Sequence, residues 1–222
     1  MKNNNQNEMS LECESYIHKR IVQVALSDNN RIKQYENVLK TFVQKPDFDE
    51  TAFKSNNHFY YPFNKGKSKS FMDFKGKQNA YSSYMNHVGN MQKCIEEKNI
   101  DNALEHAGRA LHFLQDISEP HHSHKGNILQ KIMEKAVHLE FEAYVRYNWE
   151  KFFGSLSQEI HSEKSNDFSD LFIKTAKHSA NSDVATKRNK EDWDNIARDG
   201  LSNAVSATKE FVAMFDRLLV QK

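Results

Sequence analysis

A scarcity of helix-breaking residues is the feature that most constrains the fold of this chain. Its 222 residues include only 7 glycines and 3 prolines. Sheet proteins with many tight turns usually need more of both, because these residues supply the backbone angles of turns. Apolar residues instead recur at helical spacing, as in Ala103, Ala107, Ala110, Leu111 and Leu114. We therefore predict an all-α fold, a compact single-domain helical bundle.

The periodic segments predict the order of the elements. Asp101 is the expected N-cap of a strong helix at 100–117, and Pro120 is its expected end. No linker divides the chain, so we expect a disordered tail at 1–10 and one helical domain at 11–222. Helices are predicted at about 11–27, 30–43, 78–98, 100–117, 128–153 and 169–179, with one or two more to the end, and loops at 44–76, 121–126 and 154–168.

Charge and hydropathy weigh against two classes of protein. Lys and Arg number 31 and Asp and Glu number 30, whereas a protein that binds nucleic acid by bulk charge has a clear basic excess. No stretch approaches the roughly 18–20 apolar residues of a membrane span, so no transmembrane segment is expected. The start of the chain has no apolar signal region, which predicts a cytoplasmic protein or a leaderless effector, or a secreted protein whose start has been replaced.

Histidines and carboxylates concentrate in HFLQDISEPHH at 112–122. His112 and Asp116 are four residues apart on a predicted helix, so they share one face. A helix break at Pro120 lets His121 or His122 turn back towards that face. Such a pair is commonly a solvated surface pair when it stands alone, but the apolar neighbours here indicate burial. A buried imidazole beside a carboxylate needs partners, and a metal ion would supply them.

A second pair with the same spacing, His138 and Glu142, lies on a later predicted helix. One imidazole and one carboxylate on each of two helices is a common way for bundles to build metal sites, and both groups are ordinary zinc ligands. The sequence therefore predicts a metal site.

Other histidines carry less information. His58 lies in an aromatic loop and His18 on the first predicted helix; each is as readily explained by packing as by metal binding. The remaining four that we examined have no carboxylate in a clear pairing position and are predicted to be ordinary: His87, His106, His161 and His178.

Several segments, in order, resemble the zinc-dependent phospholipases C of Gram-positive bacteria, which share their fold with the S1/P1 nucleases. The segment at 112–122 is similar to the family signature H-x-L-x-D-x-x-x-P-x-H. The other matching segments are HKRIVQVAL at 18–26, HFYYPFNKGK at 58–67, HLEFE at 138–142 and the last helix at 201–219. The resemblance spans about residues 11–219 and implies the phospholipase C/P1 nuclease type of fold, with up to three zinc ions in a cleft.

The resemblance also implies the ligands of each ion. One zinc would be held by His122, His138 and Glu142. A second would be held by His58, His112, Asp116 and an aspartate ahead of His58, and the third by His18 and a bridging Asp116. His121 falls at a variable position of the signature.

Two departures from the family leave alternatives open. The aspartate ahead of His58 is Asp47, with Asp49 as the other candidate. The family's third zinc also uses the free amine of an N-terminal Trp, and this chain has no Trp before Trp149. A centre of two or three zinc ions is therefore expected, and two if the chain begins at Met1.

The resemblance implies a phosphodiesterase that cleaves glycerophospholipids such as phosphatidylcholine into diacylglycerol and a phosphorylated head group. Asp47 would orient or deprotonate the attacking water, or serve only as a ligand. Four loop aromatics would line the cleft, touch lipid during transient contact with a membrane surface, or pack in the core: Phe59, Tyr60, Tyr61 and Phe63. The alternatives are a single-strand nuclease or nucleotide phosphatase, which would act on nucleic acid, and a zinc-binding homologue without catalysis.

Overall fold

The computed structural model describes residues 16–50, 58–60, 79–123, 128–154, 156, 164–181 and 192–221, and only the backbone of 128–136. Every regular element in these ranges is a helix, which confirms the predicted all-α fold. The tail expected at 1–10 lies outside the described residues. The elements are a helix at 16–25, η1 (Ile32–Tyr35), α2 (Glu36–Phe42), α3 (Lys45–Asp49), α4 (Ala80–Glu96), α5 (Ile100–Asp116), α6 (Pro120–Ser123), α7 (Ile128–Tyr147), α8 (Trp149–Phe153), α9 (Phe168–Ala180) and α10 (Trp193–Val220).

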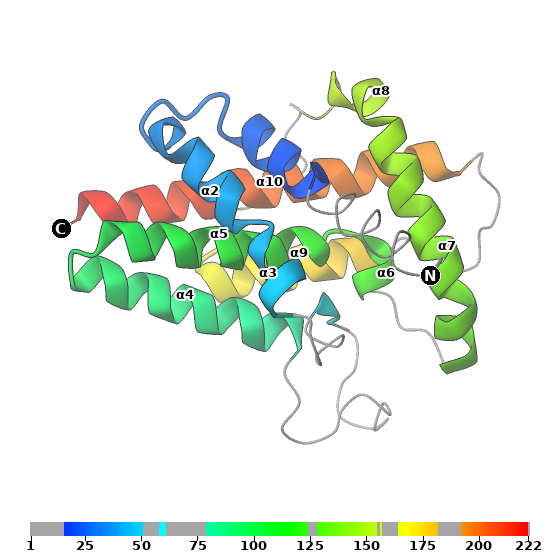
Figure 1. The fold of residues 1–222 in the computed structure, drawn as a ribbon, viewed down its shortest axis with the longest axis horizontal. Helices are drawn as coiled ribbons and strands as arrows, with labels where there is room; N and C mark the ends of the chain where they lie inside the picture. Colours follow the sequence, from blue (N-terminus) through cyan, green and yellow to red (C-terminus); the bar gives the residue numbers. More distant parts are fainter. Residues whose placement is uncertain are drawn as a thin grey trace, which may run out of the picture.

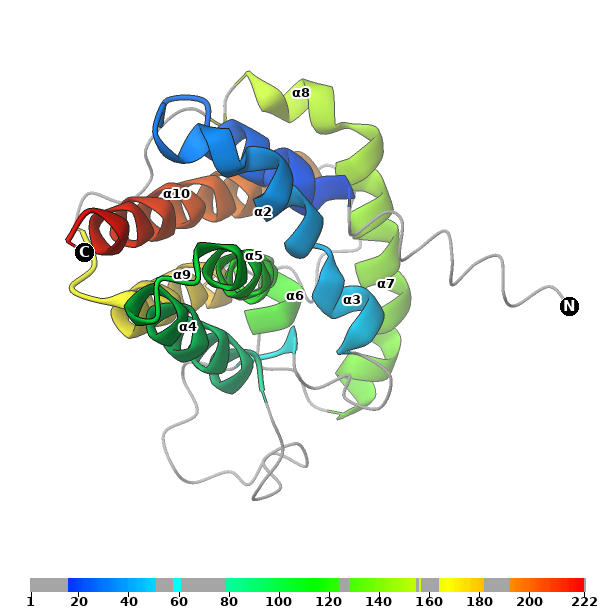
Figure 2. The same cartoon turned by 60° about the vertical axis from the view of Figure 1, so that its left-hand side comes forward.

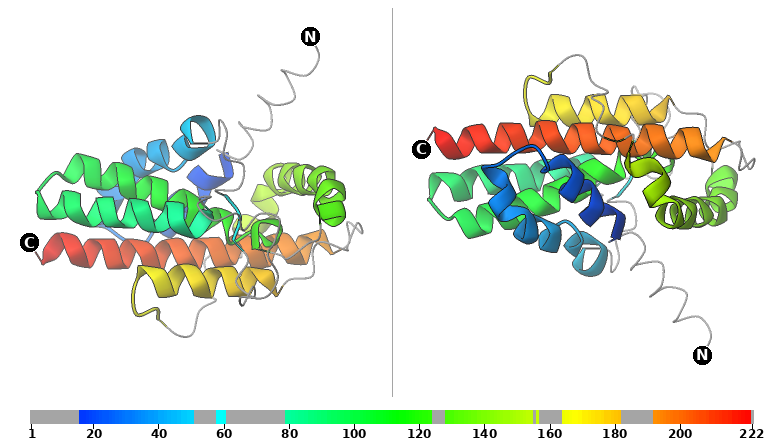
Figure 3. Two further views of the ribbon diagram at one scale, coloured as in Figure 1. Left: turned by 90° about the horizontal axis from the view of Figure 1, so that it is seen from below. Right: turned by 90° about the horizontal axis from the view of Figure 1, so that it is seen from above.

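Four long helices, α4, α5, α9 and α10, run side by side, and α7 crosses near one end of them (Figure 1). Viewed from below, α7 is seen almost along its own axis while the other four lie lengthwise (Figure 3). The short helices α3 and α6 lie between the end of α5 and α7 (Figure 2). This end of the bundle, where α5 meets α6 and α7, carries the candidate site.

Two apolar cores support this arrangement. The larger one lies among α4, α5, α9 and α10 and includes the fully buried Tyr84, Phe113 and Phe172. The smaller one joins α7 and α8 to the first half of α10, through residues such as Phe141 and Trp193. The helix at 16–25 and α10 contribute to both cores, so packing fixes α7 relative to the bundle.

Helix α2 approaches α5 unusually closely at Gly108. A Cβ atom at this position would lie 2.6 Å from Phe42 Cβ and 3.2 Å from the Leu39 carbonyl oxygen. The missing side chain is therefore what allows the two helices to touch through their backbones.

The polar caps differ from expectation at one helix. Asn99, and not Asp101, caps α5, because its side chain accepts a hydrogen bond from the Asn102 backbone N–H at 3.2 Å. Asp101 already lies in the first turn, where the positive end of the helix dipole stabilises its carboxylate.

Proline explains two more corrections. The loop predicted at 44–76 contains α3, with Pro46 in its first turn, and the loop predicted at 121–126 begins with α6, which starts at Pro120. Proline suits these positions because its missing N–H would have no partner in the first turn of a helix. Helix α5 itself ends at Asp116, ahead of Pro120. The single helix expected at 128–153 is divided at Asn148 into α7 and α8.

Candidate metal centre

Five of the predicted ligands meet in what we call the first cluster: His18, Asp47, His58, His112 and Asp116. They come from the helix at 16–25, from α3, from the short segment at 58–60 and from α5, and all five are buried.

Asp116 lies at the middle of the first cluster. Its Oδ2 is 2.6 Å from His58 Nδ1 and 3.2 Å from His112 Nε2, and its Oδ1 is 3.2 Å from His18 Nε2. Asp47 Oδ1 lies 3.4 Å from His112 Nε2. Two sets of three residues have ligand atoms within 4.8 Å of one another, namely His18–Asp47–His112 and His58–His112–Asp116. Asp116 thus offers a different oxygen to each side, as a bridging carboxylate would.

Neutral acceptors hold two of these imidazoles in a fixed orientation. His112 Nδ1 donates to the Val43 carbonyl oxygen at 2.9 Å, and His18 Nδ1 donates to Gln115 Oε1 at 2.8 Å. The Gln115 amide is itself held by a bond from its Nε2 to Thr208 Oγ1 at 3.2 Å. When Nδ1 carries the hydrogen, Nε2 is the nitrogen that can bind a metal, and such outer contacts are typical of metal-binding histidines.

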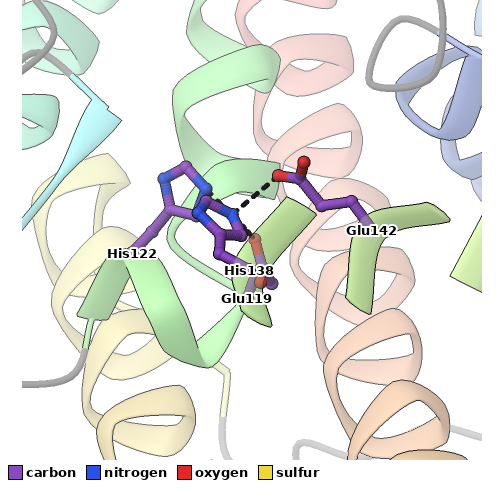
Figure 4. A group of neighbouring side chains, drawn as sticks. All are labelled: Glu119, His122, His138 and Glu142. Atoms are coloured by element: carbon purple, nitrogen blue, oxygen red, sulfur yellow. Dashed lines mark hydrogen bonds and ion pairs between the residues drawn. The ribbon is translucent and has the colours of Figure 1, made fainter. Parts of the chain in front are cut away.

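The second cluster contains Glu119, His122, His138 and Glu142 (Figure 4). Glu119 lies between α5 and α6, His122 belongs to α6, and the other two belong to α7. His122 Nε2 and His138 Nε2 lie 3.1 and 3.0 Å from Glu119 Oε2, and His138 Nε2 lies 2.6 Å from Glu142 Oε1. His122 Nδ1 donates to the backbone oxygen of His58 at 2.9 Å, so this Nε2 is also the one turned towards the cluster.

The residues fit divalent metal ions. Neutral imidazoles and carboxylates are the donor set of zinc in proteins. In a tetrahedral site with bonds of about 2.0–2.1 Å, ligand atoms are about 3.3–3.4 Å apart, and most distances above are within a few tenths of that. His58 turns its Nδ1 towards the cluster, 2.6 Å from Asp116 Oδ2 and 3.1 Å from His112 Nε2.

Without a metal, the carboxylates raise the pKa values of three imidazoles, those of His18, His122 and His138. Burial alone would lower the pKa of His18, but the hydrogen bond and charge of Asp116 raise it to about 9. Burial would also lower the pKa of His122, but Glu119 outweighs this effect and raises the pKa to about 9. Burial also lowers the pKa of His138, but the charges of Glu119 and Glu142 raise this pKa well above its usual value. Metal binding therefore has to displace protons from Nε2 atoms.

The two candidates for the loop aspartate have different surroundings. Asp47 is 4% exposed and faces the first cluster. Asp49 points instead to Arg109, with both of its oxygens within 2.8 Å of the guanidinium. The structure thus brings Asp47, and not Asp49, to the other predicted ligands.

The loop aromatics are divided. Phe59 stacks on His122 with ring centres 4.9 Å apart, at the edge of the second cluster. Tyr60 packs on Tyr81 and Phe172 and so belongs to the core. Tyr61 and Phe63 lie outside the described residues.

Sequence reasoning missed Glu119, which is the centre of the second cluster. It also left His121 aside, whose Nδ1 lies 2.6 Å from Glu119 Oε1. Glu119 follows the helical part of α5, so no helical spacing pointed to it. Its position one residue before the Pro-His-His turn was the available signal.

Two histidines predicted to have no carboxylate partner do have one. His87 Nε2 lies 3.2 Å from Glu50 Oε1, and His178 Nε2 lies 3.0 Å from Asp199 Oδ1. Both pairs join different helices or segments, which spacing along one helix does not reveal. His161 lies outside the described residues.

Known families and curated sequences offer no match to this chain: no family model and no curated protein is similar enough to be found. Solved structures do match. Alpha-toxin of Clostridium perfringens, from the avian strain SWCP, superposes with a TM-score of 0.69 at 17% identity over 96% of this chain. Alpha-toxin of Clostridium absonum gives 0.66 at 16% identity over 93%.

The chain spans 64% and 62% of the length of these two toxins. At such low identity the similarity concerns the fold. The chain has the all-α fold found in the alpha-toxins, in agreement with the fold predicted from the sequence.

Proposed function

We propose that this chain is a zinc-dependent phosphodiester hydrolase of the phospholipase C type. Its substrates are glycerophospholipids such as phosphatidylcholine, which it cleaves to diacylglycerol and a phosphorylated head group. The proposal rests on three histidines, His18, His112 and His122. Their Nδ1 atoms are bonded to neutral oxygens and their Nε2 atoms face carboxylates. This arrangement favours metal ligands over simple ion pairs, because the ring orientation is fixed before any ion binds.

Each residue has a role in the proposed site. The metal ligands of the first cluster are His18, Asp47, His58, His112 and Asp116. Those of the second cluster are His122, His138 and Glu142. Bound divalent ions supply neutralisation of the negative phosphate and a lower pKa for a bound water. Asp47 is buried at the edge of the first cluster, where its carboxylate orients the attacking water or accepts its proton. The alternative is that Asp47 acts only as a metal ligand.

The lipid substrate is preferred to nucleic acid on grounds of charge. A polyanionic strand is bound by many Lys and Arg contacts, whereas acidic and basic residues of this chain balance to a net charge of +1. No helix in the described part of the chain is long and apolar enough to cross a bilayer. Contact with lipid is proposed to be transient and at the membrane surface.

The test combines metal content with a substrate panel. We expect elemental analysis of the purified protein to give two or three zinc ions per chain. The zinc-loaded protein should hydrolyse phosphatidylcholine vesicles faster than sphingomyelin vesicles or single-stranded DNA. Hydrolysis of DNA alone would establish the nuclease alternative, and zinc binding without turnover of any substrate would establish the non-catalytic one.

A matched pair of variants tests the role of Asp47. Asp47→Asn should lose most of the activity, whereas Asp49→Asn, two residues along the same helix and exposed, should retain it. Equal activity of the two variants would contradict the assignment.

A further inference from the structure

Glu119 differs from the other residues of the second cluster because no motif predicted it. It follows α5 by three residues, and its backbone N–H donates to the Asp116 carbonyl oxygen at 2.9 Å. This tight turn directs its side chain at the imidazoles of His122 and His138 (Figure 4).

The two oxygens of Glu119 have separate partners. Oε1 accepts a hydrogen bond from His121 Nδ1 at 2.6 Å. Oε2 lies 3.1 Å from His122 Nε2 and 3.0 Å from His138 Nε2. His121 is itself held in place, because its ring stacks on that of His138 with centres 4.9 Å apart. One oxygen is thus fixed by an outer partner while the other faces two predicted metal ligands, which is the usual setting of a metal-binding carboxylate.

We propose that Glu119 is a fourth protein ligand of the metal ion in the second cluster, in addition to His122, His138 and Glu142. This inference rests on the proposed metal centre and deepens it. All four side chains offer ligand atoms within 4.8 Å of one another. A zinc ion with four protein ligands is a closed, structural site, whereas catalytic zinc keeps a position for water or substrate.

The charge of the set agrees with a closed site. Two carboxylates and two neutral imidazoles neutralise a divalent ion completely, so it has little remaining attraction for an anionic phosphate. The first cluster has only five residues for two groups, which share His112. Even with Asp116 bridging, these residues supply fewer ligand atoms than the eight that two closed four-ligand sites need. Substrate phosphate and the attacking water therefore bind at the first cluster, and the ion of the second cluster fixes α7 to the turn between α5 and α6.

The first experiment measures zinc affinity by competition with a chromophoric chelator. Glu119→Gln should weaken the binding of one zinc equivalent by more than about 100-fold. Loss of an outer partner alone costs at most about this factor. Glu142→Gln should weaken the binding of the same equivalent. Glu150→Gln is the control, since Glu150 is exposed and pairs only with Arg20 among the contacts described; it should leave every equivalent unchanged. Unchanged affinity in a folded Glu119→Gln variant would overturn the proposal.

The second experiment uses the wild-type chain, so it does not depend on how a variant folds. Loading with cadmium should give one NMR resonance for each occupied site. Titration with chloride should shift the resonances of the open sites and leave one resonance unmoved, that of the second cluster. A shift of every resonance would overturn the closed site. Both readouts count and probe the ions without turnover, so a failure of the lipid substrates to react would bear on the proposed function alone.

Discussion

The two clusters are built from different parts of the chain. The first cluster draws on four segments that are far apart in the sequence, whereas the second draws on one turn and α7. Each has a central carboxylate that faces several imidazoles, Asp116 in the first and Glu119 in the second. The first cluster is supported at two Nδ1 atoms by neutral acceptors, and the second at one. The first cluster therefore depends on the whole fold, and the second on how α7 is attached to it.

His58 connects the two clusters. Its imidazole faces Asp116 in the first, and its backbone oxygen accepts the hydrogen bond from His122 Nδ1 in the second. The clusters are therefore expected to differ in metal affinity and to remain coupled in geometry.

Loss of the central carboxylate of the first cluster should have the largest effect. Asp116→Asn removes a negative charge that three imidazoles share, and we expect it to lose at least one zinc equivalent. A metal ion stabilises a phosphoryl transition state by several kcal/mol, so a loss of about 4 kcal/mol corresponds to a roughly 1000-fold fall in turnover. Elemental analysis and vesicle hydrolysis measure the two effects, with His138→Ala as the matched loss from the second cluster. Full zinc content in Asp116→Asn would refute the first cluster.

The pH dependence of stability should be opposite with and without metal. In the metal-free chain the pKa values of His18 and His122 are raised to about 9, above the ordinary value of 6.5. A raised pKa stabilises the folded state fully below the unfolded value, and this contribution is lost as pH rises through the folded value. The free energy of unfolding should therefore fall between about pH 6.5 and 9, by at most roughly 3 kcal/mol per imidazole.

Zinc reverses the trend, because protons compete with it for the same nitrogens. Urea unfolding at several pH values, with chelator or with excess zinc, checks both signs. His18→Gln and His122→Gln should each reduce the metal-free slope, which separates the contribution of one cluster from that of the other. An increase of metal-free stability with pH over this range would contradict the assignment.

Gln115 should affect only the first cluster. Gln115→Met keeps the volume of this buried side chain but leaves His18 Nδ1 without its acceptor. Loss of such an outer contact typically weakens metal binding by about 10–100-fold. Chelator competition should show this change in one equivalent and none in the second cluster. The control is Gln23→Met on the same helix as His18, where the exposed Gln23 side chain contacts Arg20. Equal effects of the two variants would be evidence against the orienting role.

Arg109 should have the smallest effect. Its guanidinium binds Asp49 and Glu50 at 2.7 Å and so attaches the end of α3 to α5. Burial raises the pKa of Glu50, but the contacts from His87 and Arg109 outweigh it and lower this pKa to about 2.

The variant Arg109→Met should lower the free energy of unfolding by about 1 kcal/mol, since the network is partly exposed. It should also weaken zinc slightly in the first cluster, because α3 carries Asp47. Urea unfolding of the zinc-loaded chain measures the first effect, and Lys209→Met, which removes an exposed pair with Asp28, is the control. A larger change in the second cluster than in the first would contradict this view of α3.

The sequence predicted the parts of the centre that depend on helical spacing. His112 with Asp116 and His138 with Glu142 share faces because each pair is four residues apart on one helix. It did not predict Glu119, whose direction is set by the turn between α5 and α6, or the pairing of Asp49 with Arg109, which depends on how α3 packs on α5. The motif resemblance supplied His18, Asp47 and His58, since nothing in their local spacing brings them to α5.

A similar limit applies to the fold. The long helices were predicted because their apolar faces are continuous, but α3 and α6 were not, because proline was taken to end helices and here it begins them.

The geometry of the candidate site depends on the absence of a Cβ atom at Gly108. It lies one helical turn before His112, and α2 rests against it immediately before the chain enters α3. The carbonyl oxygen of Val43, which orients His112, and the carboxylate of Asp47, which faces the same ring, both follow this contact by a few residues. A single methyl group at position 108 would push α2 outwards and move an orienting oxygen and a candidate ligand together, without touching either of them.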